Sequence, residues 1–166
     1  MGFDSPKTVV LETTETFDKP IEARRSLKEK AEKFLRRKIG GKRLKEHWHK
    51  GIWGIHVHEQ EHLDKAPDYQ AHAHLCVDGD DIEKDKLNER WDYQGCGEAK
   101  IGSVVPQNDN NLSMAVRRFG MYVRCKSKRV PEGGTDGDDN PPMTPKAKVD
   151  YALALENKGA YWQWGL

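Results

Sequence analysis

The chain has 166 residues, 33% of them charged, and a net charge of +1, which suits one domain with one hydrophobic core. No apolar run approaches the roughly 20 residues of a membrane span, and no charged-then-apolar N-terminus predicts a secretory signal. Three cysteines without Cys-x-x-Cys spacing imply neither a disulfide framework nor a structural zinc site. The sequence therefore predicts a single domain over residues 1–166, in the reducing cytoplasm and without membrane association.

The first half of the chain predicts a strand, a helix and a second strand. Residues 8–17 are rich in β-forming Thr and Val. Pro20 can open a helix over 21–39, where apolar side chains follow a helical stripe, and the glycine pair that follows ends it. Residues 51–60 alternate apolar and polar side chains, as in a half-buried strand.

Positive charge is concentrated in two segments. From Arg24 to Lys50 there are twelve Lys and Arg against three Glu, and from Arg117 to Arg129 there are six basic residues and no acid. Either segment alone would suit a solvated helix face. Two such segments on a chain of near-zero net charge favour a polyphosphate partner, of which nucleic acid is the usual one.

Histidine pairs occur on two consecutive predicted strands. Residues 71–79 read as a strand that places His72 and His74 on one face, about 7 Å apart, and the preceding strand places His56 and His58 on one face in the same way. Neutral imidazoles on a rigid face can hold a divalent ion and leave its other positions open. A lone His-x-His is more often two surface histidines, but a hairpin with a ten-residue connector would gather four imidazoles.

These pairs predict a metal site in which His72 and His74 are ligands. The neighbouring strand would supply a third ligand, for which His58 is favoured. The competing candidates are His56, Glu59 and Gln60.

The second half predicts further helices and one strand. Helices are expected over 81–93, 112–128 and 146–164, a strand over 99–106, and a flexible loop over 130–145. Tyr122 lies at the rim of the apolar stripe of the middle helix, beside Arg118 and Lys126. A tyrosine at such a rim usually packs its ring and leaves its hydroxyl in water. The order of elements predicts an α+β fold, with helices packed on a central antiparallel sheet.

On these features the chain resembles the nicking domain of rolling-circle replication initiator (Rep) proteins of plasmids and viruses, in the HUH endonuclease superfamily. The run His72-Ala73-His74-Leu75 stands where that family has His-hydrophobic-His on a central strand. The segment 115–126 resembles its nucleophile helix, and weaker similarities lie in 9–16, 91–97 and 162–165. The family often has Tyr-x-x-Lys, whereas here Cys125 takes the lysine position and Lys126 follows.

The resemblance implies a ferredoxin/RRM-like fold, Mn²⁺ or Mg²⁺ as cofactor, and metal-dependent, site-specific nicking and joining of single-stranded DNA that initiates rolling-circle replication. Tyr122 would attack the scissile phosphate and form a 5′-phosphotyrosine, and Arg118 and Lys126 would help to activate a phenol whose ordinary pKa is about 10. The implied partners are single-stranded or hairpin origin DNA and a host helicase or polymerase.

Three alternatives stay open. Single-tyrosine HUH transposases share the order of histidines before tyrosine, unlike conjugative relaxases, whose nucleophile is N-terminal. A non-catalytic nucleic-acid-binding α+β module would use the same shape, with incidental histidines. A metal-dependent hydrolase would use water as the nucleophile and form no covalent intermediate.

Overall fold

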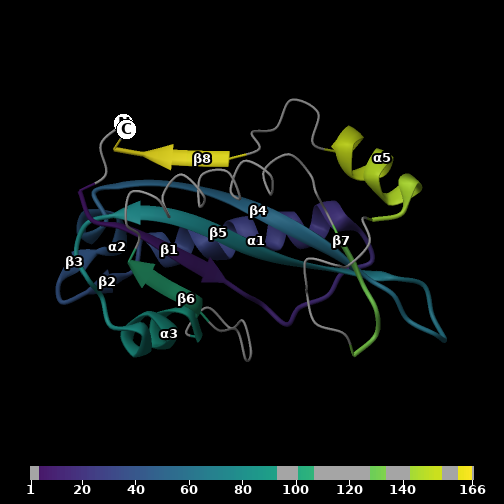
Figure 1. The fold of residues 1–166 in the computed structure, drawn as a ribbon, viewed down its shortest axis with the longest axis horizontal. Helices are drawn as coiled ribbons and strands as arrows, with labels where there is room; N and C mark the ends of the chain where they lie inside the picture. The colour runs from purple at the N-terminus through teal and green to yellow at the C-terminus, as the bar shows by residue number, and fades with distance from the viewer. Residues whose placement is uncertain (1–3, 93–100, 107–127, 134–142, 155–160, 166) are drawn as a thin grey trace.

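The computed structural model of the protein consists of a β-sheet with helices packed against it (Figure 1). It describes residues 4–92, 101–106, 128–133, 143–154 and 161–165. The sheet order is β6-β1-β5-β4-β7, and β8 pairs with β4 as well. The strands are β1 (Pro6–Leu11), β4 (Lys50–Gln60), β5 (Asp68–Asp78), β6 (Ile101–Pro106), β7 (Lys128–Val130) and β8 (Tyr161–Trp164). All neighbours are antiparallel except β7, which runs parallel to β4. The predicted α+β class with a central antiparallel sheet is confirmed.

The hairpin of β4 and β5 forms the middle of the sheet. Its two strands have 11 residues each and pair without a register shift, from Lys50 opposite Asp78 to Gln60 opposite Asp68. Because successive side chains alternate between faces, one register decides which residues share each face. The predicted strand alternation of both segments is therefore present, over slightly longer spans.

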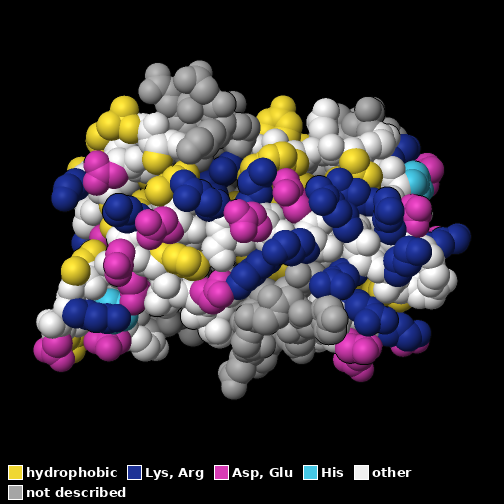
Figure 2. All heavy atoms as spheres, turned by 180° about the vertical axis from the view of Figure 1, so that it is seen from behind, with side chains coloured by type: hydrophobic (Ala, Val, Ile, Leu, Met, Phe, Trp, Pro, Cys, Tyr) yellow, Lys and Arg dark blue, Asp and Glu magenta, His cyan; other side chains and the backbone are white. Residues whose placement is uncertain are grey.

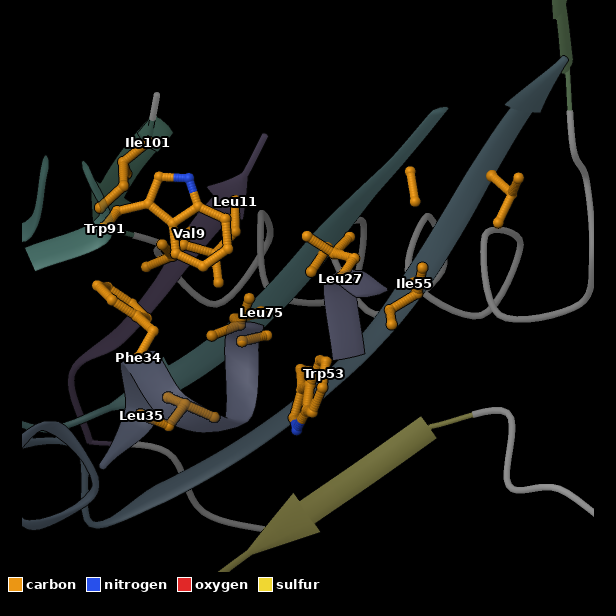
Figure 3. Packing of buried hydrophobic residues seen from close by; sticks show 14 of the residues in the cluster. Val9, Leu11, Leu27, Phe34, Leu35, Trp53, Ile55, Leu75, Trp91 and Ile101 are labelled. Atoms are coloured by element: carbon orange, nitrogen blue, oxygen red, sulfur yellow. The ribbon is translucent and has the colours of Figure 1, made fainter. Parts of the chain in front are cut away.

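Helix α1 (Pro20–Leu35) covers one face of this hairpin and makes the core with it. Its Leu27 and Phe34 lie beside Leu75 of β5, and all three side chains are at most 1% exposed (Figure 3). The helix begins at Pro20, whose fixed φ suits a first turn. The remaining described helices are α2 (Leu44–His47), α3 (Lys84–Asp92) and α5 (Pro145–Ala154). None of them, nor α1, combines the length and the apolar character needed to cross a bilayer.

Several predicted boundaries are wrong. The first strand ends at Leu11 rather than residue 17, and the first helix ends at Leu35 rather than 39. A short hairpin of β2 (Lys38–Ile39) and β3 (Lys42–Arg43) follows instead. Gly40 and Gly41 have φ of 58° and 87°, so they make a hairpin turn with two left-handed residues rather than only a helix stop.

The helix predicted over 146–164 is also wrong in part, because helix α5 ends at Ala154. Residues 161–164 form β8, which pairs with the first half of β4. Trp162 packs on Trp53 with ring centroids 4.3 Å apart, and the Trp164 indole N–H donates to the Trp48 carbonyl at 2.6 Å. These aromatic contacts across the sheet outweigh the helical pattern of the preceding residues. Of the predicted helix 112–128, all but Lys128, which begins β7, lies outside the described residues, as do 134–142 of the predicted loop.

Candidate metal centre

Four imidazoles gather on the sheet face that α1 does not cover. His56 and His58 come from β4 and His72 and His74 from β5, and His56 lies directly opposite His72 in the register. Neighbouring rings in this group have centroids 4.4 to 5.0 Å apart. The rings share one face because each pair is two residues apart on its strand. We call these four side chains the histidine cluster.

Three members of the cluster are arranged for one ion. His56, His72 and His74 each offer a ring nitrogen, and these three nitrogens lie within 4.8 Å of one another. The Nε2 atoms of His72 and His74 are 2.7 Å apart. Two ligands bound at about 2.1 Å and at right angles are about 3 Å apart. His72 and His74 thus already have nearly the spacing of adjacent ligands, and His56 offers a ring nitrogen within 4.8 Å of both.

The fourth member, His58, faces the other nitrogen of His72. Its Nε2 lies 2.5 Å from His72 Nδ1, whereas His72 Nε2 points to His74. One imidazole cannot offer both nitrogens to the same ion. The arrangement therefore favours His56 over the predicted His58 as third ligand, and gives His58 the place of a partner that fixes the tautomer and orientation of His72.

The two other predicted competitors do not join the cluster. Glu59 lies on the opposite face of β4, where its carboxylate accepts hydrogen bonds from the backbone N–H of Thr144 at 2.9 Å and from its hydroxyl. Gln60 shares the histidine face, but its amide donates to Gln70 at 3.5 Å. Strand alternation alone excludes Glu59.

The surroundings keep the cluster in a form that can bind a cation. Burial, and then the charge of His56, lowers the pKa of His74 to about 4, so its ring is neutral at neutral pH, which is the form that binds a metal ion. Cys76 follows two residues later on β5, and burial together with Asp78 raises its pKa to about 11. That thiol stays protonated, which makes it a poor ligand. The donor set of the cluster is therefore all nitrogen.

The predicted nucleophile, Tyr122, and its two activating neighbours, Arg118 and Lys126, are not among the described residues.

A second group of potential ligands, which the sequence analysis did not find, lies at the other end of the hairpin. Asp4, His49 and Asp78 each have a ligand atom within 4.8 Å of the others. The buried Asp78 carboxylate already accepts the backbone N–H groups of Asp4 at 3.0 Å and Ser5 at 2.5 Å. Burial raises the pKa of Asp78, but these hydrogen bonds and the nearby His49 and Lys50 outweigh it and leave the pKa lowered. The role of Asp78 is to hold the start of β1 against β5.

A scan against protein-family models, a search of curated proteins and a search of solved structures each found no match to this chain. The resemblance to Rep nicking domains thus rests on the motifs of the sequence.

Proposed function

We propose that this protein is a metal-dependent enzyme that nicks and rejoins single-stranded DNA, as an initiator of rolling-circle replication. The observation that carries the proposal is the histidine cluster. Two adjacent strands bring four imidazoles to one face, with three nitrogens close enough to share an ion. His56 and His58 are buried and His72 and His74 are half-buried. Removing polar rings from water is costly, so stability alone does not favour this cluster, and a functional role does.

The residues present fit a divalent transition ion. A cation held by His56, His72 and His74 would polarise a scissile phosphate and offset the charge that develops on its leaving oxygen. Imidazole is a borderline-soft ligand, whereas Mg²⁺ prefers oxygen and gives up its water reluctantly. The all-nitrogen donor set therefore supports Mn²⁺ over Mg²⁺ among the two ions that the resemblance implies.

The proposed nucleophile is the phenol oxygen of Tyr122. It forms a bond to the phosphorus while the bond from phosphorus to the 3′ oxygen breaks, so that the DNA 5′ end becomes a phosphotyrosine. The phenol proton leaves, and the 3′ oxygen takes up a proton and ends as a hydroxyl. Reversal with a new 3′ hydroxyl joins the strands, since the phosphodiester energy is kept in the tyrosyl bond. Arg118 and Lys126 are the proposed activating neighbours.

The experiment is detection of the covalent intermediate. The protein is incubated with Mn²⁺ and a random-sequence pool of single-stranded oligonucleotides labelled at the 3′ end, then boiled in detergent and resolved on a gel. The expected result is labelled protein from the wild type and from the control Tyr161→Phe, and none from Tyr122→Phe, which loses only a hydroxyl. Sequencing of the attached DNA would give the cleavage site.

The hydrolase and the non-catalytic module each have their own outcome in the same experiment. Cleavage without any adduct would favour the hydrolase that uses water. Binding without cleavage would favour the non-catalytic module. An adduct that persists in Tyr122→Phe would show that another tyrosine is the nucleophile.

A further inference from the structure

The β2–β3 hairpin lies at one end of the molecule, where its Ile39 packs against the hydrophobic core (Figure 1). Lys38 pairs with Arg43 and Ile39 with Lys42, around the turn at Gly40 and Gly41. A Cβ atom built on either glycine would meet no described atom within 4 Å. The turn itself therefore stands clear of the part of the chain that the structure describes.

The base of this hairpin is nevertheless fixed. The Leu44 N–H donates to the Arg37 carbonyl at 2.9 Å, and the Leu44 side chain is fully buried. His47 reaches the Ile39 carbonyl at 2.8 Å with Nε2 and the Asp80 carboxylate at 2.9 Å with Nδ1. Both partners of His47 are acceptors, so both of its nitrogens are best protonated, which agrees with its raised pKa. The hairpin is thus presented in one orientation.

Charge on the hairpin is unbalanced, unlike charge elsewhere on the same side. Between Arg36 and Lys45 there are six Lys and Arg and no acid. Among the described residues, no carboxylate pairs with the side-chain nitrogens of Lys38, Lys42 or Arg43, and all three side chains are exposed. The Glu46 carboxylate, at the base of the hairpin, accepts the backbone N–H of Arg43 at 2.5 Å. On α1, by contrast, Lys and Arg are interleaved with acidic side chains across the rear face (Figure 2). For example, Lys28 pairs with Glu32 at 3.2 Å.

The hairpin is also separate from the histidine cluster. In the chain it is followed by α2 and then by β4, which begins at Lys50, six residues before His56 along that strand. At roughly 3.3 Å per residue this is about 20 Å. A polyanion bound by the hairpin would therefore occupy a place of its own.

We propose that the segment Arg36–Lys45 is a basic hairpin that binds double-stranded DNA through its phosphates, with the ribbon entering the major groove. A two-stranded ribbon fits the major groove of B-form DNA, which is about 12 Å wide, whereas the deep, narrow major groove of A-form RNA does not admit it. Single strands are bound largely by aromatic stacking, and the segment has no aromatic residue. The bare Gly-Gly turn allows the backbone to approach the duplex closely.

The test is a comparison of two triple variants with equal loss of charge. The first removes the hairpin cations (Lys38→Gln, Lys42→Gln and Arg43→Gln), and the control removes exposed lysines of α3 and α5 (Lys84→Gln, Lys86→Gln and Lys146→Gln). Binding to a fluorescent 20-base-pair DNA duplex of random sequence is measured by anisotropy over a range of salt concentrations. If three phosphate contacts are lost, the slope of log affinity against log salt should fall by about 2.7.

The expected result is at least a tenfold loss of duplex affinity in the hairpin variant and wild-type affinity in the control. Both should melt like the wild type, because the changed side chains are exposed. Wild-type duplex binding by the hairpin variant, or an equal loss in both variants, would overturn the proposal. The proposal would also be overturned if unlabelled single-stranded DNA or duplex RNA displaced the fluorescent duplex as effectively as unlabelled duplex DNA does. Tyr122→Phe should bind the duplex normally, so failure of the nicking proposal would leave this one standing.

Discussion

Metal binding to the histidine cluster should stabilise the folded protein, and the loss of that stabilisation in histidine variants should identify the third ligand. At a free ion concentration 100 times the dissociation constant, binding to the folded state alone contributes about 2.7 kcal/mol. For a chain of 166 residues, each kcal/mol raises the melting temperature by about 2–4 °C. We therefore expect Mn²⁺ to raise the melting temperature of the wild type by about 5–11 °C relative to the protein in EDTA.

The variants divide according to the nitrogens they remove. His56→Ala removes one of the three grouped nitrogens. If affinity falls 100-fold, the same ion concentration contributes only about 0.4 kcal/mol, which is a shift of about 1 °C. His58→Ala removes the neighbour of His72 Nδ1. Removing a residue that orients a metal ligand costs at least about tenfold in metal affinity. A tenfold loss would leave about 1.4 kcal/mol of stabilisation by Mn²⁺ and a rise in melting temperature of about 3–6 °C.

Differential scanning calorimetry with and without Mn²⁺ measures these shifts, and each variant is its own reference in EDTA. His62→Ala is the control, since His62 lies beyond the end of β4 and its Nε2 pairs with the Asp68 carboxylate at 2.9 Å. It should keep the full shift. A wild type that shows no shift with Mn²⁺ would refute the metal site. A shift kept by His56→Ala and lost by His58→Ala would return the third position to His58.

Three further predictions concern the framework. Asp78→Asn should lower the free energy of unfolding by about 2–4 kcal/mol at pH 7, because an amide cannot accept both N–H groups as a carboxylate does. Since the folded pKa of Asp78 is lowered, this contribution is present above about pH 4. Urea titrations should show the difference in stability between wild type and variant shrinking as the pH falls further. The folded pKa of His47 is raised, first by the Ile39 carbonyl and then by Asp80, so its contribution should be complete below about pH 6.5 and decline as pH rises through the raised value; a gap between wild type and His47→Ala that is wider at pH 9 than at pH 6 would contradict this. Gly51→Ala should cost about 1–3 kcal/mol and change the tryptophan fluorescence, since a Cβ at this position would overlap the Trp164 ring; unchanged spectra and stability would argue against the β8 pairing.

The histidine strands could be predicted from sequence because their alternation is strict over many residues. That alternation settles which face each side chain takes, so four imidazoles on one face followed from it. The choice between His56 and His58 as third ligand could not be predicted from the alternation. It depends on which residue lies opposite His72 and on which nitrogen of His72 each neighbour contacts. These features are set by strand register and side-chain rotamer, which a periodic sequence pattern does not specify.

Two elements were missed, one because its strands are very short and the other because its partner strand is distant in the chain. The strands of the basic hairpin have two residues each, too few to show a period of two, and the Gly-Gly pair equally suits a helix end. Tyr161–Trp164 is a strand because it finds Trp53 and Gly51 on β4, more than a hundred residues earlier. The local sequence, which follows a helical segment, does not carry that information.

The histidine cluster has a consequence for the order of folding. All four imidazoles lie between His56 and His74, on one hairpin whose loop spans only residues 61–67. Contacts this close in sequence form early, because little chain entropy is lost in closing a short loop. The flanking strands β1 and β8 come from near the two ends of the chain and must join later. An ion could therefore bind to the nascent hairpin and favour its correct register before the rest of the sheet is complete.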